Sequence, residues 1–309
     1  KKSVLNIAGR LEENGIKPSV IYGSLPPEIR RRQMALFNEK KTQVVVSTDA
    51  IGMGLNLPVR RIVFLEVEKF DGVSRRPLVI SEIKQIAGRA GRFGLYDTGY
   101  VTALGQKNLN YLKNTLNIPE QDIDIVSLGF PQVLLTMDAP LDAIIKLWHE
   151  AEPSAPFRKI NVDEILFLYG YAYKERYFIA DFDDKYLLYK MITCPIDIKD
   201  RELVRQWLRY CMSYTSDISL DKPDKHSKYQ GLMKYESYYK KLDLYYQFSV
   251  RMVEEDWLEN ERDKTQAKIM QLLSKSKDEY IIRCRYCGRI LPIGNSRNIC
   301  RDCYSMIRR

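Results

Sequence analysis

The chain has 309 residues, of which 45% are hydrophobic and 29% charged, a balance typical of a folded protein with two or three domains. No run approaches the roughly 18 apolar residues of a membrane span, and the basic opening Lys1-Lys2 leads into an amphipathic stretch rather than a secretory signal core. The net charge of +9 favours a polyanionic partner such as nucleic acid, although a basic surface without such a partner gives the same figure. Because no Met opens the chain, we expect its natural N-terminus upstream.

Helical and strand patterns alternate through the first part of the chain. Apolar residues recur at helical spacing from Val4 to Leu11, and Gly15 and Pro18 are expected to end that helix. Strands are predicted over 19–22, 43–47, 61–67 and 99–104, and helices from Pro26 and over 80–93. Such alternation predicts an α/β domain over 1–117, with a parallel sheet, flanking helices and its function at the carboxyl ends of the strands.

Beyond residue 117 helical periods dominate. We predict a mostly α-helical domain over 118–280, whose tyrosine-rich stripes are expected to lie in its core. A long helix or helical hairpin is predicted over 235–273. The last part, 281–309, is rich in cysteine and arginine and is predicted to be a small separate domain.

An arginine-bearing segment runs from Gln85 to Arg92. If it is helical, Gln85, Arg89 and Arg92 fall within about 60° of one another around the axis, opposite an apolar face. Gly88 and Gly91 lower helix propensity, which suggests that something approaches the backbone closely. Guanidinium groups beside glycines suit a triphosphate, but a solvated basic face gives the same pattern.

A second polar segment follows the β-branched run that ends at Val46. Thr48 offers a hydroxyl, Asp49 a carboxylate, and Gly52 and Gly54 offer backbone N–H groups close to a ligand. An ordinary aspartate cap on a strand-to-helix turn is the simpler explanation of this segment taken alone.

Taken together and in this order, the two segments resemble motifs V and VI of superfamily two helicases. Three stretches, 22–27, 48–57 and 85–93, are similar to the DExH-type RNA helicase of the mitochondrial degradosome and its bacterial relatives. The resemblance is close through about Leu104 and weaker beyond. It implies that 1–117 is the second RecA-like domain of such an enzyme.

The resemblance also implies roles for individual residues. Arg89 and Arg92 would contact the γ-phosphate of ATP, with Arg92 as the arginine finger and Gln85 positioning the same group. Asp49, Gly52 and Gly54 would lie on the nucleotide side of motif V. Thr48, Arg30 and Gly23 would contact the nucleic-acid backbone.

No Gly-x-x-x-x-Gly-Lys-Ser/Thr loop occurs in the chain, so the phosphate cradle of a P-loop enzyme is missing from it. We therefore expect ATP and Mg²⁺ to be held mainly by a first RecA-like domain outside this chain, and the isolated chain to be inactive. The alternative is a non-catalytic nucleic-acid-binding or scaffold protein that keeps a RecA-like shell. Arg89 and Arg92, both present, argue against that alternative.

Four cysteines near the end form two Cys-x-x-Cys pairs separated by twelve residues: Cys284, Cys287, Cys300 and Cys303. Four thiolates on two tight turns suit a structural, tetrahedral zinc ion, a zinc ribbon, rather than the disulfides of a secreted chain or a single thioredoxin-like pair. The surrounding arginines suit either a nucleic-acid contact or, as the alternative, docking of a protein.

The function predicted from the sequence is therefore the C-terminal portion of an ATP-dependent RNA helicase that couples ATP hydrolysis to translocation and unwinding. By resemblance its direction is 3′ to 5′, its substrate is RNA more than DNA, and RNA-decay proteins are its expected partners. A bacterial cytoplasm is the expected location, with the mitochondrion as the alternative.

Overall fold

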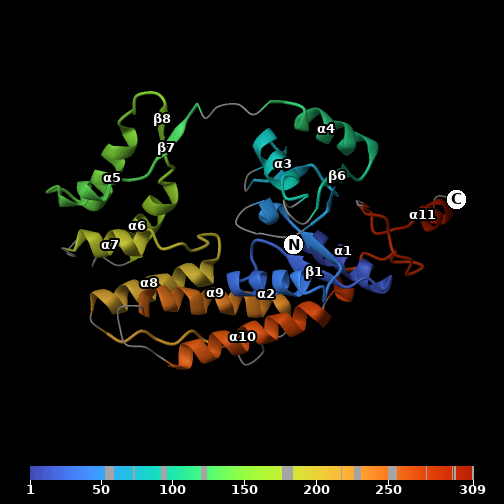
Figure 1. Cartoon of the computed structure of the whole chain (residues 1–309). Coiled ribbons are helices and arrows are strands. Elements are labelled where there is room, and N and C mark those ends of the chain that lie inside the picture. The colour runs from blue at the N-terminus through green and yellow to red at the C-terminus, as the bar shows by residue number, and fades with distance from the viewer. Residues whose placement is uncertain are drawn as a thin grey trace. The chain divides into compact units, whose positions relative to one another are not determined.

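The computed structural model falls into two compact units (Figure 1). It describes residues 1–52, 59–71, 74–91, 96–119, 124–175, 184–216, 218–225, 231–249, 256–275, 277–293, 295 and 297–307. The first unit comprises 1–120, 230–236 and 266–309, and the second comprises 121–229 and 237–265. Within the described part, no helix combines the length and apolar character needed to cross a lipid bilayer.

Parallel strand pairs form the framework of the first unit. β1 (Pro18–Ile21) pairs with β2 (Val44–Ser47), and β3 (Arg61–Phe64) pairs with β6 (Tyr100–Ala103). The strands predicted over 19–22, 43–47 and 99–104 are confirmed to within two residues at each end. The prediction of a parallel α/β arrangement for this part of the chain is confirmed as well.

A short antiparallel hairpin lies where the sequence predicted the end of one strand and a polar loop. Its strands are β4 (Glu68–Phe70) and β5 (Arg75–Pro77). The strand predicted over 61–67 is β3, which ends at Phe64, three residues earlier than predicted. The hairpin was missed because most of its side chains are charged and partly or fully exposed, so it lacks the apolar alternation that marks a half-buried strand.

Four helices flank these strands: α1 (Lys2–Glu13), α2 (Pro27–Asn38), α3 (Ile80–Ala87) and α4 (Gln106–Leu116). Their apolar faces bury side chains such as Leu5, Ile29, Ile83 and Leu112 almost completely, as the helical spacing predicted. Burial of one such side chain stabilises the fold by about 1.5–3 kcal/mol.

The helix predicted over 80–93 ends at Ala87, which corrects the prediction. Beyond it Gly91 adopts a φ of +74°, and a Cβ at that position would lie 2.5 Å from the backbone nitrogen of Gly99. The segment around Gly99 is therefore what approaches the backbone closely at Gly91. Because the helix has ended, Arg89 is not placed by the helical wheel used above.

The second unit consists mainly of helices, which the sequence predicted for this region. They are α5 (Leu141–Glu150), α6 (Asp163–Glu175), α7 (Lys185–Ile192), α8 (Arg201–Thr215) and parts of α9 (Leu232–Ser249) and α10 (Asp256–Lys275). A small parallel pair, β7 (Val126–Leu128) with β8 (Phe157–Lys159), precedes and interrupts them. Side chains of Asp184 and Asp200 cap α7 and α8.

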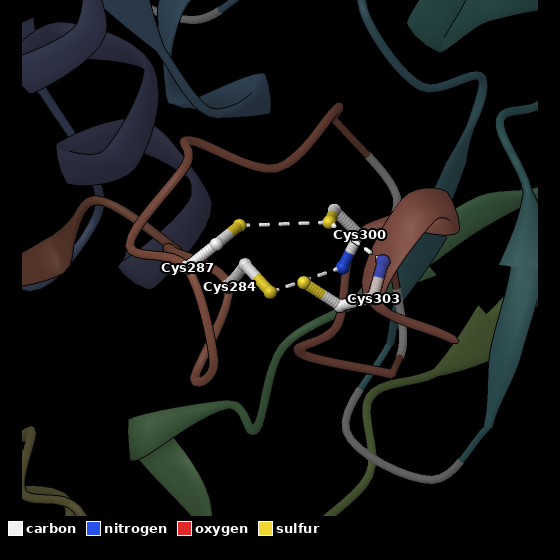
Figure 2. Close-up of side chains that lie close together, drawn as sticks. All are labelled: Cys284, Cys287, Cys300 and Cys303. Atoms are coloured by element: carbon white, nitrogen blue, oxygen red, sulfur yellow. Dashed lines mark hydrogen bonds between the residues drawn. The ribbon is translucent and has the colours of Figure 1, made fainter. Parts of the chain in front are cut away.

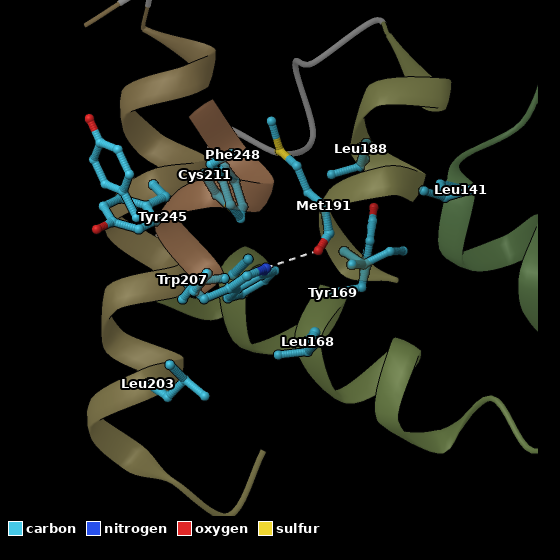
Figure 3. Packing of buried hydrophobic residues seen from close by; sticks show 14 of the residues in the cluster. Leu141, Leu168, Tyr169, Leu188, Met191, Leu203, Trp207, Cys211, Tyr245 and Phe248 are labelled. Carbon is cyan, nitrogen blue, oxygen red and sulfur yellow. Dashed lines mark hydrogen bonds between the residues drawn. The ribbon is translucent and has the colours of Figure 1, made fainter. Parts of the chain in front are cut away.

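Trp207 lies at the centre of the second unit's apolar core (Figure 3). Its ring is fully buried, and its indole nitrogen donates a hydrogen bond of 2.9 Å to the carbonyl of Met191. Tyr245 packs edge-on against Tyr210 with ring centroids 5.8 Å apart. The prediction that the tyrosine-rich stripes lie in a core is confirmed for Tyr169, Tyr238, Tyr239 and Tyr245, whereas Tyr173 and Tyr246 are exposed.

The C-terminal segment belongs to the first unit. The chain between α10 and the cysteines packs on α1, where a Cβ on Gly9 would lie 2.7 Å from the carbonyl of Lys277. Ion pairs join Lys277 to Glu12 and Arg283 to Glu13. The ranges 1–117, 118–280 and 281–309 remain predictions of domain boundaries.

Candidate functional site

The first part of the candidate site lies where β1 and β2 end. The two strands are parallel and pair Ile21 with Ser47, so the residues that follow them, Gly23 and Thr48, emerge at the same sheet edge. The backbone N–H of Thr48 donates to the carbonyl of Ile21 at 3.2 Å. Its hydroxyl accepts a hydrogen bond of 3.3 Å from the N–H of Ala50 and so shapes the turn.

A short 3-10 turn, η1 (Asp49–Gly52), continues from Thr48 and meets the arginine segment. The Arg89 guanidinium donates a hydrogen bond of 2.8 Å to the carbonyl of Gly52. A Cβ on Gly52 would stand 3.4 Å from the side chain of Ile86 and 3.9 Å from that of Gln85. The two segments singled out in the sequence are therefore in direct contact.

Arg89 is half-buried in this contact. Its Nε is buried and has no hydrogen-bond acceptor among the described residues. A buried guanidinium N–H without an acceptor is costly, by about 1–3 kcal/mol or more, so an anionic ligand at this position would be stabilised. The arrangement can therefore neutralise negative charge on a phosphate that is held by another surface.

Charged side chains of the β4–β5 hairpin hold Asp49, the first residue of the η1 turn. Lys69 on β4 donates to Asp49 at 3.1 Å and contacts Glu82 at 2.7 Å. Arg76 on β5 donates twice to Glu82, at 2.9 and 3.0 Å. Hydrogen bonds, first from Arg76 and then from Lys69, lower the pKa of Glu82 to about 2. Bonds to Glu82 and Asp49 raise the pKa of Lys69.

Sequence reasoning missed Lys69 and Arg76, because a basic residue in a polar loop carries no signal of its own. The signal that could have found them is the order of charges in 66–76, where three acidic residues precede two arginines and can pair with them across a hairpin. In the structure the hairpin holds the Asp49 carboxylate from one side.

Within the described residues, the structure does not connect the remaining predicted site residues to the turn after β2. Arg30 is half-buried in the first turns of α2, and its buried Nε has no acceptor in the described part of the chain. None of the hydrogen bonds described joins it to Thr48 or Gly23. Arg92 and Gly54 lie outside the described residues.

The four cysteines form a compact cluster in the C-terminal segment (Figure 2). All four Sγ atoms lie within 4.8 Å of one another, and those of Cys287 and Cys300 are 3.6 Å apart. Sulfurs bound to one zinc ion at about 2.3 Å lie about 3.8 Å from each other, whereas a disulfide requires about 2.05 Å. The spacing therefore fits a tetrahedral metal site better than a disulfide.

Backbone geometry supports this cluster. The N–H of Cys284 donates to the carbonyl of Arg289 at 2.7 Å, and Gly288 closes the turn with a φ of +72°. Backbone N–H groups of Cys300 and Cys303 point at the sulfurs of Cys284 and Cys300, at 3.3 and 3.4 Å. Such bonds, that from Cys300 first, lower the pKa of Cys284 to about 6, whereas hydrogen bonds among the sulfurs, that with Cys300 first, raise the pKa of Cys303 to about 12.

The other two cysteines stand apart from the cluster. Burial raises the pKa of Cys194 to about 12 and that of Cys211 well above its ordinary value. Cys211 is a fully buried core residue, and Cys194 is half-buried.

Comparison with known families identifies the α/β part of the chain. Residues 1–94 match the family described as the helicase conserved C-terminal domain. This match covers both the turn with Asp49 and the segment with Arg89. This match supports the RecA-like fold expected for the parallel α/β region.

The individual proteins to which the chain is similar are RNA helicases. The chain is 33% identical to the mitochondrial ATP-dependent RNA helicase SUV3 of Oryza sativa subsp. japonica, over 92% of its own length and 50% of that protein. It is 31% identical to the mitochondrial DExH-box helicase DExH16 of Arabidopsis thaliana, over 82% of its length and 47% of that protein. The chain is thus similar to SUV3 and DExH-type RNA helicases over most of its length, and its residues 1–94 match the helicase conserved C-terminal domain.

The similarity is strongest over part of the chain. Identity rises to 46% with SUV3 of Candida albicans, over 40% of this chain and 18% of that protein. The chain spans about half or less of the length of these curated relatives. A solved C-terminal domain of the DEAD-box protein Dbp5 also matches, with a TM-score of 0.31 and 19% identity over 53% of this chain and 71% of that one.

The relatives correct one prediction from the sequence. A bacterial cytoplasm was the expected location, yet the helicases to which the chain is similar are named as mitochondrial proteins in rice, yeast and Arabidopsis. The bacterial cytoplasmic assignment is therefore wrong. The motifs alone could not reveal this, because ATP and RNA are handled by the same residues in either compartment.

Proposed function

We propose that this chain is the C-terminal portion of an ATP-dependent RNA helicase that couples ATP hydrolysis to movement along RNA. The observation that carries the proposal is the hydrogen bond from Arg89 to Gly52. It joins the predicted nucleotide-contacting segment to the turn that follows β2. A change at the nucleotide can thereby reach the sheet edge that carries Thr48 and Gly23.

In this proposal the chain supplies half of the nucleotide site. Arg89 and Arg92 neutralise the γ-phosphate, Gln85 positions it, and the backbone and carboxylate of the turn line the site (Asp49, Gly52 and Gly54). ATP with Mg²⁺ supplies the phosphoryl group and is held mainly by a first RecA-like domain outside this chain. The guanidiniums act by stabilising negative charge on the transferring phosphoryl.

The RNA side of the proposal uses the end of the β1–β2 pair. Gly23 is exposed and a Cβ there would meet nothing within 4 Å, so a phosphate backbone can approach the chain at this point. Thr48 and Arg30 supply a hydroxyl and a guanidinium to phosphates. Translocation from 3′ to 5′, a mitochondrial location and RNA-decay partners are proposed from the similarity to SUV3-type helicases.

A structural zinc ion in the C-terminal segment completes the proposal. Cys284, Cys287, Cys300 and Cys303 would hold it and leave no open position for catalytic water, so its contribution is to folding.

The test uses the full-length protein that contains this chain. Arg92→Ala and Arg89→Ala should each lower RNA-stimulated ATP hydrolysis by about 10³-fold, as loss of an arginine finger does elsewhere. Arg205→Ala, an exposed arginine of α8, serves as the matched control and should leave the rate unchanged. The isolated chain should hydrolyse no ATP. Near-normal hydrolysis in both site variants would overturn the roles proposed for Arg89 and Arg92, whereas a wild-type protein that hydrolyses no ATP would favour the non-catalytic scaffold.

A further inference from the structure

The cysteine segment carries two pairs of arginine and tyrosine side chains outside the helicase-domain match. The guanidinium of Arg285 lies 5.0 Å from the ring centroid of Tyr286, and that of Arg297 lies 4.9 Å from the ring of Tyr304. Tyr286 is 56% exposed, although a tyrosine of this size usually buries most of its ring. The backbone N–H of Arg285 donates to the carbonyl of Asn298 at 3.1 Å, so the loops that bear the two arginines are in contact.

The charged side chains of this segment are almost all positive. Residues 281–309 contain seven arginines and a single acidic residue, Asp302. Asp302 pairs with Arg289, and Arg283 pairs with Glu13 of α1. In the described part of the chain, no ion pair is formed by Arg285 or Arg297. Two guanidiniums stacked on rings therefore remain available to a ligand anion.

We infer that this arginine–tyrosine face, defined by Arg285, Tyr286, Arg297 and Tyr304, binds single-stranded RNA. Phosphates would meet the guanidiniums, and an unpaired base would stack on the exposed Tyr286 ring. A guanidinium beside a ring combines a phosphate contact with a stacking surface, which suits single-stranded RNA. A protein partner would instead bury the exposed apolar side chains of the same segment, such as Met306 and Ile307. That the strand is RNA rather than DNA rests on the proposed function.

The face is held firmly against the helicase domain. The chain that leads into it packs closely on Gly9 of α1, and ion pairs from Lys277 and Arg283 reach Glu12 and Glu13 of the same helix. A strand bound to the face would therefore gain contacts in addition to those at the β1–β2 edge. The result would be a longer RNA-binding surface within the first unit.

The test measures binding of a labelled single-stranded RNA of about 20 nucleotides to the complete 309-residue chain by fluorescence anisotropy at several salt concentrations. Arg285→Ala with Arg297→Ala should weaken binding at least about tenfold and reduce the salt slope by about 1.4, because each phosphate contact on a single strand contributes about 0.7. Tyr286→Ala should weaken binding about tenfold, whereas Tyr286→Phe keeps the ring and should bind normally. The control exchanges two exposed arginines of α8, Arg205→Ala with Arg209→Ala.

Each outcome decides the inference. Loss of affinity in the face variants with retained binding in the control supports it. Unchanged affinity in the face variants overturns it and would favour a protein partner for these arginines. An equal loss of affinity in the control also overturns it, because the effect would then come from net charge alone. Arg30→Ala tests the proposed function separately, because it should weaken binding through the β1–β2 edge whether or not the face binds RNA.

Discussion

The two candidate sites of the first unit differ in how complete they are. The cysteine cluster brings four sulfurs within 4.8 Å of one another and supports them with backbone N–H groups. The edge built by Thr48, Asp49 and Arg89 is half-exposed, and Arg89 keeps a buried Nε without an acceptor among the described residues. The cysteine cluster can supply all four ligands of a metal ion by itself. The edge with Arg89 presents positive charge to a ligand that a second surface would have to hold.

This difference predicts different consequences of mutation. In the closed cluster, the ligand would contribute directly to folding, so a lost sulfur should lower stability. At the open edge, Arg89 keeps a buried Nε without an acceptor among the described residues, so its removal should change activity more than stability.

Cys284→Ser should give the largest stability effect. It removes one of four thiolates from a site in which metal binding and folding are coupled, so the purified chain should lose about one zinc ion per molecule and unfold at a lower temperature. Metal analysis and thermal unfolding measure both. Cys194→Ser, outside the cluster, is the control and should keep its zinc. Zinc retained in full by Cys284→Ser would show that the cluster is not a four-cysteine site.

Gly91→Ala should have the next largest effect, at more than about 2 kcal/mol. An alanine at positive φ costs about 1–2 kcal/mol, and here its Cβ would also lie 2.5 Å from the nitrogen of Gly99. Gly15→Ala is a close match, because its φ is +76° but nothing lies within 4 Å of the added Cβ. The difference in free energy of unfolding between the two variants measures the close approach alone. Equal values would mean that the contact at Gly99 relaxes without cost.

The sequence predicted the strands of the first unit well because each combines β-branched residues with a clear turn signal. It also predicted a close backbone approach at Gly88 and Gly91, which the structure confirms for Gly91, where the approaching segment is that of Gly99, whereas a Cβ on Gly88 would meet only the carbonyl of Lys84 at 3.0 Å. The helix end at Ala87 was missed because apolar spacing continues through Ala90. Helical periodicity cannot show that one glycine has switched to positive φ.

The candidate site was predictable where its residues are consecutive and missed where they come from a distant segment. Thr48, Asp49, Gly52 and Arg89 stand in two recognisable runs, and the structure brings these runs together. Lys69 reaches the same turn from a hairpin whose existence depends on pairing across strands rather than on local pattern. Contacts of that kind are decided by tertiary structure, which a single sequence does not display.

The smallest predicted effect concerns Glu82, whose carboxylate accepts hydrogen bonds from Arg76 and Lys69. Because its pKa in the folded chain, about 2, lies below the ordinary value of 4.5, the carboxylate contributes stability that is present above pH 4.5 and is lost as the pH falls toward 2. Glu82→Gln should therefore lower the urea midpoint at pH 7 slightly, and the difference from the wild-type chain should shrink below pH 4.5. Exposed pairs contribute about 0–1 kcal/mol each, so the loss at neutral pH should be of that order. Glu39→Gln, an exposed partner of Lys41, is the control and should show a smaller difference at every pH. A difference between Glu82→Gln and the wild-type chain that stays constant from pH 7 to pH 3 would mean that packing, and not the ionised carboxylate, holds the hairpin to α3.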